Sequence, residues 1–135
     1  MKKLKGFSLI ELLVVLAIIA LLAAIATQVY FSYIRKSRRI DAVNSLLGIS
    51  LAQERYRSTH TTYGTLAQVW AGVTASSGGY YTLAISSNTA TGYTATATAT
   101  GDQVNDVASG TSCTPMTLSV SSGAVSKTPT ACWPT

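Results

Sequence analysis

Residues 1–26 read MKKLKGFSLIELLVVLAIIALLAAIA, and this stretch decides the fold. Three lysines and a glycine precede an apolar run that carries a single carboxylate, Glu11, near its start. From residue 12 to residue 26 no side chain is polar, and about 20 such residues are enough to cross a hydrocarbon core as a helix. A carboxylate inside a membrane helix is costly, so Glu11 indicates a functional site.

Two kinds of export signal fit a basic leader followed by an apolar run. A conventional signal peptide is cleaved after its apolar core, and residues 23–26 (AAIA) mimic such a site only weakly. The other small-residue break, Gly6–Phe7, precedes the apolar run, so cleavage there removes only the leader and keeps the helix. An uncleaved single-pass anchor is a third reading. In each case the lysines keep the N-terminus in the cytoplasm.

The motif KGFSLIE (residues 5–11) followed by an uninterrupted apolar helix resembles the prepilin signature of type IV pilins and of the related pseudopilins. The resemblance implies that a prepilin peptidase cuts between Gly6 and Phe7 and also methylates the new amine of Phe7. It places Glu11 at the fifth mature position, where the family keeps a carboxylate. We expect Glu11 to neutralise the N-terminal ammonium of a neighbouring subunit among packed helices in the filament.

The rest of the chain contains one modest domain and no recognisable catalytic constellation. The formal charge of +5 comes from 10 basic and 5 acidic residues. Without the leader lysines the balance is 7 − 5 = +2, so the basicity is largely a targeting feature. One histidine, five carboxylates and no nucleophile elbow or phosphate loop predict a protein that is not an enzyme and that needs no cofactor or metal. Asp102 and Asp106 are candidate calcium ligands, but two acids without a third oxygen-rich partner favour a solvated loop.

The chain is expected to divide into five segments. These are a cleaved leader (1–6), a transmembrane and filament-core helix (7–29), an amphipathic half of the same helix (30–57), a connecting loop (58–79) and an antiparallel sheet with a C-terminal disulfide-bounded region (80–135). One helix from about residue 8 to 57 is on the order of 75 Å long. In its second half an apolar stripe is predicted at Ile34, Ile40, Val43, Leu46, Leu47 and Leu51. The family usually has helix breakers at the positions of Ala20 and Gln28, so a straighter helix is expected here.

Strands are predicted at residues 80–85, 92–100, 116–120 and 124–126, joined by short turns into a meander. In the second strand the alternation of Ala95, Ala97 and Ala99 with threonines predicts that alanines face the helix and threonines face water. The expected fold class is therefore α+β: the type IV pilin fold, a long N-terminal helix, transmembrane in its first half, packed on a four-stranded antiparallel meander.

The two cysteines, Cys113 and Cys132, lie in the exported C-terminal third and are expected to pair in an oxidising compartment. They enclose 18 residues, and a bridge over such a loop contributes on the order of 3 kcal/mol. The resemblance to pilins, which typically have a C-terminal disulfide-bounded region, implies the same pairing.

Two groups of basic residues are candidates for nucleic-acid contact. The cluster Arg35, Lys36, Arg38 and Arg39 lies just outside the membrane span, where contacts with lipid and neighbouring subunits are favoured over DNA. Nearer the head, Arg55, Arg57 and Lys127 are better candidates for DNA. Tyr80, Tyr81 and Trp133 are the aromatic residues expected to be available for base stacking.

Three later stretches are similar to small pilins of the PilE kind, some of which, the ComP-like ones, capture DNA: residues 38–42 (RRIDA), 51–56 (LAQERY) and 61–63 (TTY). The resemblance implies a minor subunit of a type IV pilus for adhesion, twitching motility or DNA uptake. A ComP-like DNA receptor and a type II secretion pseudopilin are the alternatives. Expected partners are other pilins, the prepilin peptidase and methyltransferase, the inner-membrane assembly machinery, the membrane and DNA. The chain is expected in the inner membrane, with its head in the periplasm, and then in the extracellular pilus.

Overall fold

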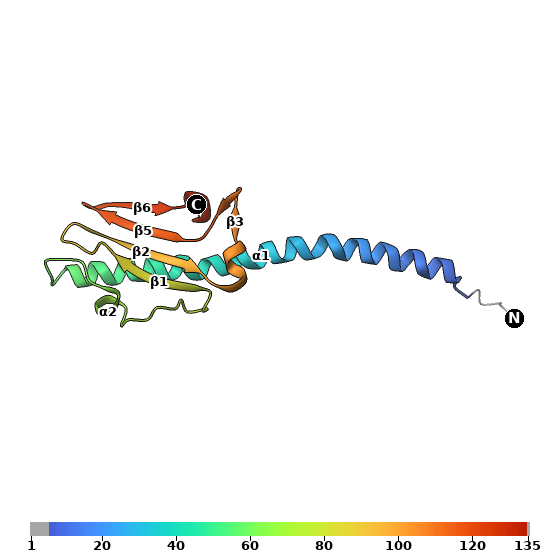
Figure 1. Cartoon of the computed structure of the whole chain (residues 1–135), viewed down its shortest axis with the longest axis horizontal. Coiled ribbons are helices and arrows are strands. Elements are labelled where there is room, and N and C mark those ends of the chain that lie inside the picture. Colours follow the sequence, from blue (N-terminus) through green and yellow to red (C-terminus); the bar gives the residue numbers. More distant parts are fainter. Residues whose placement is uncertain (1–5, 135) are drawn as a thin grey trace. The chain divides into compact units, whose positions relative to one another are not determined.

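The chain forms two compact units that share one long helix. The computed structural model describes residues 6–134, so the leader residues 1–5, with the three lysines, lie outside the described residues. The first unit ends at Ile34 and the second begins at Arg35. Helix α1 (Leu9–Arg57) belongs to both (Figure 1).

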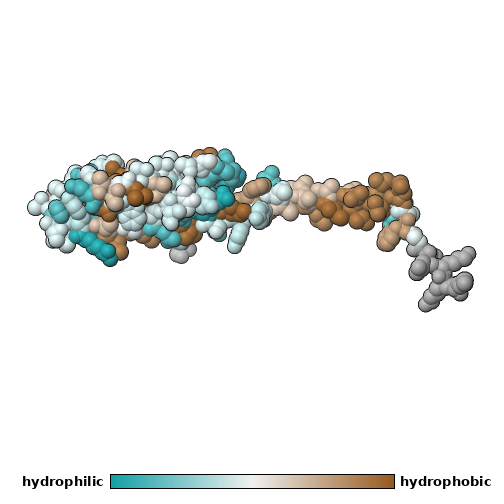
Figure 2. All heavy atoms as spheres, turned by 90° about the horizontal axis from the view of Figure 1, so that it is seen from below, coloured by the Kyte–Doolittle hydropathy of each residue, from teal (hydrophilic) through white to brown (hydrophobic). Residues whose placement is uncertain are grey.

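The first unit contains only the apolar part of α1. The helix passes without a break through Ala20 and Gln28, where the sequence lacks helix breakers. Every side chain from residue 6 to residue 33 is exposed, and Figure 2 shows apolar side chains over this part of the helix. It is long and apolar enough to cross a membrane. Since this unit provides nothing to cover these side chains, lipid or other subunits have to cover them.

The second unit contains a four-stranded antiparallel sheet, as predicted from the strand pattern. Its strands are β1 (Tyr81–Ser86), β2 (Gly92–Ala99), β5 (Met116–Ser121) and β6 (Ala124–Thr128), in the order β1-β2-β5-β6. The α+β pilin-like architecture is thereby confirmed. Each strand pairs antiparallel with the next in this order. Along the chain, an insertion separates β2 from β5.

The smaller elements were only partly predicted. A short helix, α2 (Leu66–Val69), lies in the connection after α1, within the expected connecting loop. The insertion between β2 and β5 was not predicted. It consists of the 3-10 helix η1 (Gly101–Asn105) and a hairpin of β3 (Val107–Ala108) and β4 (Thr111–Ser112). A second 3-10 helix, η2 (Thr130–Cys132), carries the second cysteine.

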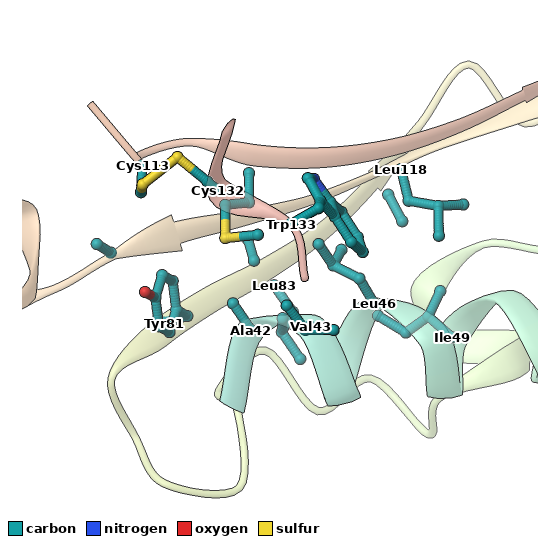
Figure 3. Close-up of a cluster of buried hydrophobic side chains, with 14 of the residues drawn as sticks. Ala42, Val43, Leu46, Ile49, Tyr81, Leu83, Cys113, Leu118, Cys132 and Trp133 are labelled. Atoms are coloured by element: carbon teal, nitrogen blue, oxygen red, sulfur yellow. A yellow bond between two sulfur atoms is a disulfide. The ribbon is translucent and has the colours of Figure 1, made fainter. Parts of the chain in front are cut away.

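The core lies between α1 and one face of the sheet. On β2 Tyr93 and the alanines point inward, and Ala95 and Ala97 are completely buried, whereas the threonines between them point outward. This is the orientation expected from the alternation. The helix contributes Ala42, Leu46 and Ile49, all completely buried. Figure 3 shows these helix side chains facing those of the sheet.

The prediction of the helix stripe was partly wrong. Val43 and Leu46 are buried, but Ile40, Leu47 and Leu51 are 47%, 43% and 56% exposed. These three residues therefore do not belong to the buried stripe of α1. The buried stripe includes instead two residues whose polarity alone would place them in water. These are Arg39 and Gln53, which are 7% and 0% exposed.

Gln53 is buried because its side-chain amide completes the hydrogen bonds of a turning backbone. Its Nε2 donates to the carbonyl of Gly64 at 2.7 Å, and its Oε1 accepts from the amide of Gly64 at 2.8 Å. With both partners present, the cost of burying the amide is largely offset. A tertiary contact also explains the glycine at position 48, since a Cβ there would lie 2.7 Å from the Trp70 ring. These two contacts fix the connecting segment against α1.

Cys113 and Cys132 form the expected disulfide, with their Cα atoms 5.6 Å apart. Both cysteines are buried, and Trp133, which is 8% exposed, packs beside them in the same core (Figure 3). The bridge therefore ties the end of the β3–β4 hairpin to η2 and holds the C-terminal segment on the sheet.

Replacing both cysteines with serine is expected to lower the free energy of unfolding of the head by about 3 kcal/mol, because the unfolded chain regains the freedom of an 18-residue loop. Chemical denaturation of the full chain in detergent micelles measures this. Reductant should bring the wild type to the level of the variant and leave the variant unchanged. Equal stability of the two oxidised proteins would contradict this role of the bridge.

Candidate functional site

Glu11 has a partner within its own chain. Its backbone amide lies 3.2 Å from the hydroxyl of Ser8, and its Oε2 accepts from the amide of Ser8 at 3.4 Å. This reciprocal pair is a capping box, which satisfies amide donors at the start of a helix. The sequence Ser8-Leu-Ile-Glu11 before an apolar run is the usual signal for it, and sequence reasoning assigned Glu11 to subunit pairing alone. Both side chains stay exposed, so Glu11 remains accessible to a second cation.

The proposed cleavage point lies just before α1. Gly6 and Phe7 precede the first helical residue, and Phe7 is 83% exposed. A Cβ placed on Gly6 would meet no atom of the described residues within 4 Å. The peptide bond between these residues is therefore accessible to an enzyme.

The basic cluster at residues 35–39 is largely neutralised by carboxylates of the insertion. Arg35 donates from Nε and Nη2 to Asp102, both at 2.9 Å, and Arg39 donates in the same way to Asp106, both at 2.6 Å. We call these four residues the Arg–Asp clasp. The arginines are one helical turn apart on α1, and the aspartates have the same spacing along the chain. The clasp thereby attaches η1 to the helix.

The two halves of the clasp differ in burial. The Arg39 and Asp106 side chains are 8% and 2% exposed, whereas those of Arg35 and Asp102 are 24% and 51% exposed. Hydrogen bonds from Arg35 hold the pKa of Asp102 below its ordinary value. The outer pair is therefore complete above the ordinary pKa of aspartate and is lost as the pH falls through the lowered value.

The clasp bears on two expectations from the sequence, the calcium site at Asp102 and Asp106 and the basic cluster at residues 35–39. Asp102 and Asp106 are already paired with arginines, and no metal-binding group of acids, histidines and cysteines occurs among residues 6–134, so a calcium site at these aspartates is not supported. Arg38, in addition, lies 4.6 Å from the centre of the Tyr80 ring. The formal charge at this end of the head is +4 − 3 = +1. The four cations are those of the basic cluster, and the three carboxylates are Asp41, Asp102 and Asp106.

The other end of α1 carries its own cations. Arg57 donates from Nη1 to the carbonyl of His60 at 2.6 Å and lies 5.9 Å from the Tyr63 ring centre. Arg55 is exposed, and its side chain makes no hydrogen bond among the described residues. Glu54 is the one acid here and accepts from the Tyr63 hydroxyl at 3.4 Å. We call Arg55, Arg57 and His60 the distal basic edge.

Lys127 is not part of the distal basic edge. It lies on β6, with its ammonium 5.1 Å from the centre of the Trp133 ring, and in the pairing register it stands opposite Leu118. No contact joins it to Arg55 or Arg57 among the described residues. The structure thus gives the three predicted DNA contacts two separate positions.

The expected stacking surfaces are not available. Tyr81 is 1% exposed and Trp133 is 8% exposed, because both are core residues. The Tyr81 hydroxyl accepts from Gln103 at 2.9 Å, and burial raises its pKa. Tyr80 is half-buried, and Arg38 lies over its ring. Base stacking on Tyr81 and Trp133 was therefore a wrong expectation, since an amphipathic tyrosine or tryptophan is compatible with either a surface or a core.

The outer face of the sheet carries no charge. On β1, β2 and β5 its residues alternate with the inward-facing ones, and the pairing register continues this face onto β6, whose residues are all exposed. The residues of the outer face are Thr82, Ala84, Ser86, Thr94, Thr96, Thr98, Thr117, Ser119, Ser121, Ala124, Ser126 and Thr128. Binding to a polyanion relies on positive side chains that displace counterions. The head can thus hold an anionic partner at the ends of α1, in the loops, or at the edge strand β6, which carries Lys127.

Comparison with known families adds two findings. A family model described as "Type IV minor pilin ComP, DNA uptake sequence receptor" matches residues 29–117, more than half of the chain. A second model, described as "Prokaryotic N-terminal methylation motif", matches residues 1–27. No curated protein matches the chain.

Replacing Arg39 with methionine is expected to lower the free energy of unfolding by about 3–5 kcal/mol, because Asp106 then remains buried without its partner. Denaturation of the full chain in micelles measures the change. The matched control is the double variant Arg39→Met/Asp106→Leu, which removes both charges and should recover most of the loss. If the double variant were as unstable as the single one, the clasp would not be held by this charge pair.

Proposed function

Because the chain belongs to the family of type IV minor pilins described as ComP, the DNA uptake sequence receptor, we propose that its head binds DNA while its helix anchors it in the pilus. The observation that carries this proposal is the family match over residues 29–117, which covers the second half of α1, strands β1 and β2 and the start of β5. Proteins of this kind are structural subunits, and the work proposed here is capture and not catalysis.

Maturation begins at the N-terminus. We propose that a prepilin peptidase cleaves between Gly6 and Phe7 and that the amine of Phe7 is then methylated. The match to the N-terminal methylation motif and the accessibility of this peptide bond support the assignment. Cleavage there removes the basic leader and leaves α1 intact.

The exposed apolar part of α1 supports two successive locations. Before assembly, residues 7–29 would span the inner membrane, with the leader in the cytoplasm and the head in the periplasm. The assembly machinery would then move the helix into the pilus, where helices of other pilins replace lipid around the same side chains. Both environments would cover the apolar side chains that are exposed in the first unit.

Glu11 gives this transfer its register. A carboxylate surrounded by apolar helices is stable only with a cationic partner. We propose that Glu11 leaves the capping box with Ser8, or shares it, and pairs with the Phe7 ammonium of a neighbouring subunit. The exposure of the Glu11 side chain in the single chain is consistent with such a second partner.

DNA is proposed to lie on charged parts of the head. The outer sheet face is neutral and the buried aromatics are inaccessible, so contact with phosphates is favoured over stacking with bases. Arg55 is free of partners among the described residues, and Arg57 keeps donors beyond its bond to His60. Lys127 adds a separate contact near the C-terminal segment. These three residues are the candidates for holding the backbone.

The Glu11→Ala variant is expected to enter the membrane normally and to be strongly depleted from sheared pili, because the neighbouring ammonium loses its counter-charge. Immunoblots of membrane and pilus fractions measure the two populations. Ser8→Ala serves as the control, since it breaks the capping box and keeps the carboxylate. Incorporation of Glu11→Ala at the wild-type level would contradict the pairing.

The double variant Arg55→Gln/Arg57→Gln is expected to bind duplex DNA several-fold more weakly than the wild type. The slope of log K against log salt should fall by about 0.9 for each phosphate that the protein no longer neutralises. Titration of the full chain in micelles with a labelled duplex, at several salt concentrations, gives both quantities. Lys36→Gln is the matched control, because it removes one cation from the other end of the head. Equal effects of the control and of the distal variant would place the DNA elsewhere, and no binding by the wild type at low salt would remove the DNA proposal.

A further inference from the structure

A cavity lies between α1 and the C-terminal segment, at the other end of the head from the distal basic edge. It has a volume of about 260 Å³ and is lined by Lys36, Arg39 and Ile40 of α1 and by residues 131–134. The lining contains two basic residues and no acidic one. One water occupies roughly 30 Å³ in the liquid, so the cavity has room for a larger anionic group.

Arg39 keeps free donors although its side chain is only 8% exposed. Its Nε and Nη2 both donate to Asp106, and Nη2 also donates to the carbonyl of Val107 at 3.5 Å. Nη1 makes no hydrogen bond among residues 6–134, and it is not one of the fully enclosed polar atoms that lack a partner. Because Arg39 lines the cavity, the two hydrogens of Nη1 are the donors that it can offer there.

Lys36 supplies the net positive charge of the cavity, since the charge of Arg39 is balanced by Asp106. Its side chain is exposed and makes no hydrogen bond or ion pair among the described residues. Lys36 and Arg39 are three residues apart on α1, and residues with this spacing are neighbours on a helix surface. An unpaired ammonium and a guanidinium with two free hydrogens therefore line the same cavity, and phosphate oxygens accept charge-assisted hydrogen bonds from both kinds of donor.

The rest of the lining is apolar. It consists of Ile40, which is 47% exposed, and of residues 131–134, which read ACWP and include the disulfide-bonded Cys132. Apolar walls next to two cations suit an amphiphile, because its phosphate can bind the cations while its glycerol and acyl groups lie on the apolar side chains. A free phosphate or a DNA backbone would gain nothing from these walls.

The place of the cavity along α1 also favours a lipid. Tyr30 and Tyr33 directly follow the proposed span and are 62% and 72% exposed, and tyrosines are enriched at the level of the lipid headgroups. Lys36 comes three residues after Tyr33, which is about 4.5 Å along a helix. The headgroup layer is roughly 5 to 8 Å thick on each side of the hydrocarbon core. In the inserted chain, Lys36 would therefore lie at the depth of the phosphates.

We propose that this cavity binds the phosphate of an anionic glycerophospholipid on the periplasmic side of the inner membrane. Lys36 and Nη1 of Arg39 are the donors, and Ile40 with residues 131–134 is the apolar wall. The inference rests on the proposed membrane location of the chain and does not depend on the DNA proposal. A lipid bound there would hold the head against the bilayer before assembly and would be released when the chain enters the pilus.

NMR of the full chain in zwitterionic phosphocholine micelles tests the proposal. Short-chain phosphatidylglycerol is added, and the amide signals of residues 131–133 are followed to saturation. Lys36→Gln is expected to weaken binding about fivefold, the effect of losing one lysine near an anionic headgroup. Ala131→Glu, which adds an acid to the lining, should weaken it further. Arg38→Gln is the matched control, because it removes a cation of the same basic cluster that does not line this cavity, and its affinity should stay within about twofold of the wild type.

Unchanged affinity in Lys36→Gln would overturn the proposal, because the lipid would then bind outside the cavity. An equal loss in Arg38→Gln would also overturn it, since that result indicates general attraction to charge. Inorganic phosphate and duplex DNA, added to separate samples, are the other sources of phosphate. If either saturated the same signals at the concentration that suffices for the lipid, the lipid assignment would be wrong. A chain that failed to insert into zwitterionic vesicles would instead remove the proposed membrane location itself.

Discussion

The packing of α1 on one face of the sheet is the contact on which the rest of the head depends. Ala42 on the helix and Ala95 and Ala97 on β2 are completely buried in this layer. Larger side chains, Leu46 and Ile49, then fill the space on either side. A core packed at this density tolerates little displacement, so the register of α1 against the sheet is fixed, and with it the position of the end of the helix.

Polar contacts add specificity to this apolar layer. Arg39 and Asp106 meet inside the head, and Gln53 completes the backbone of Gly64. Each of these groups is costly to bury without its partner, so each contact disfavours any other register of the helix. The functional consequence is at the helix terminus, where Arg57 and His60 follow directly from the last buried positions and share a hydrogen bond.

Periodicity carried most of the prediction of the fold. The alternation in β2 predicted which face is buried, and the uninterrupted apolar run predicted the first half of α1, because both patterns depend on neighbouring residues alone. Arg39 and Gln53 could not be predicted in this way, since their burial depends on partners 67 and 11 residues away. The same applies to η1 and the β3–β4 hairpin, which the Arg–Asp clasp holds. The capping box of Ser8 and Glu11 is different, because its signal was present in the sequence.

The candidate site was predicted in part. Arg55 is exposed and Arg57 is half-buried at the helix end, whereas Tyr81 and Trp133, which were chosen for stacking, belong to the core. The charges of the head consequently lie at its ends and border and leave the sheet face neutral. This distribution favours a partner that runs past the end of α1.

The central claim is that DNA lies at the end of α1. It is tested most directly by photochemical cross-linking of the full chain in micelles to a duplex with reactive groups on its backbone, followed by mass spectrometry of the linked peptides. Links are expected in the segment of residues 55–63, with a second group near Lys127. Links confined to residues 35–39, or to the threonines on the outer face of β2, would contradict it.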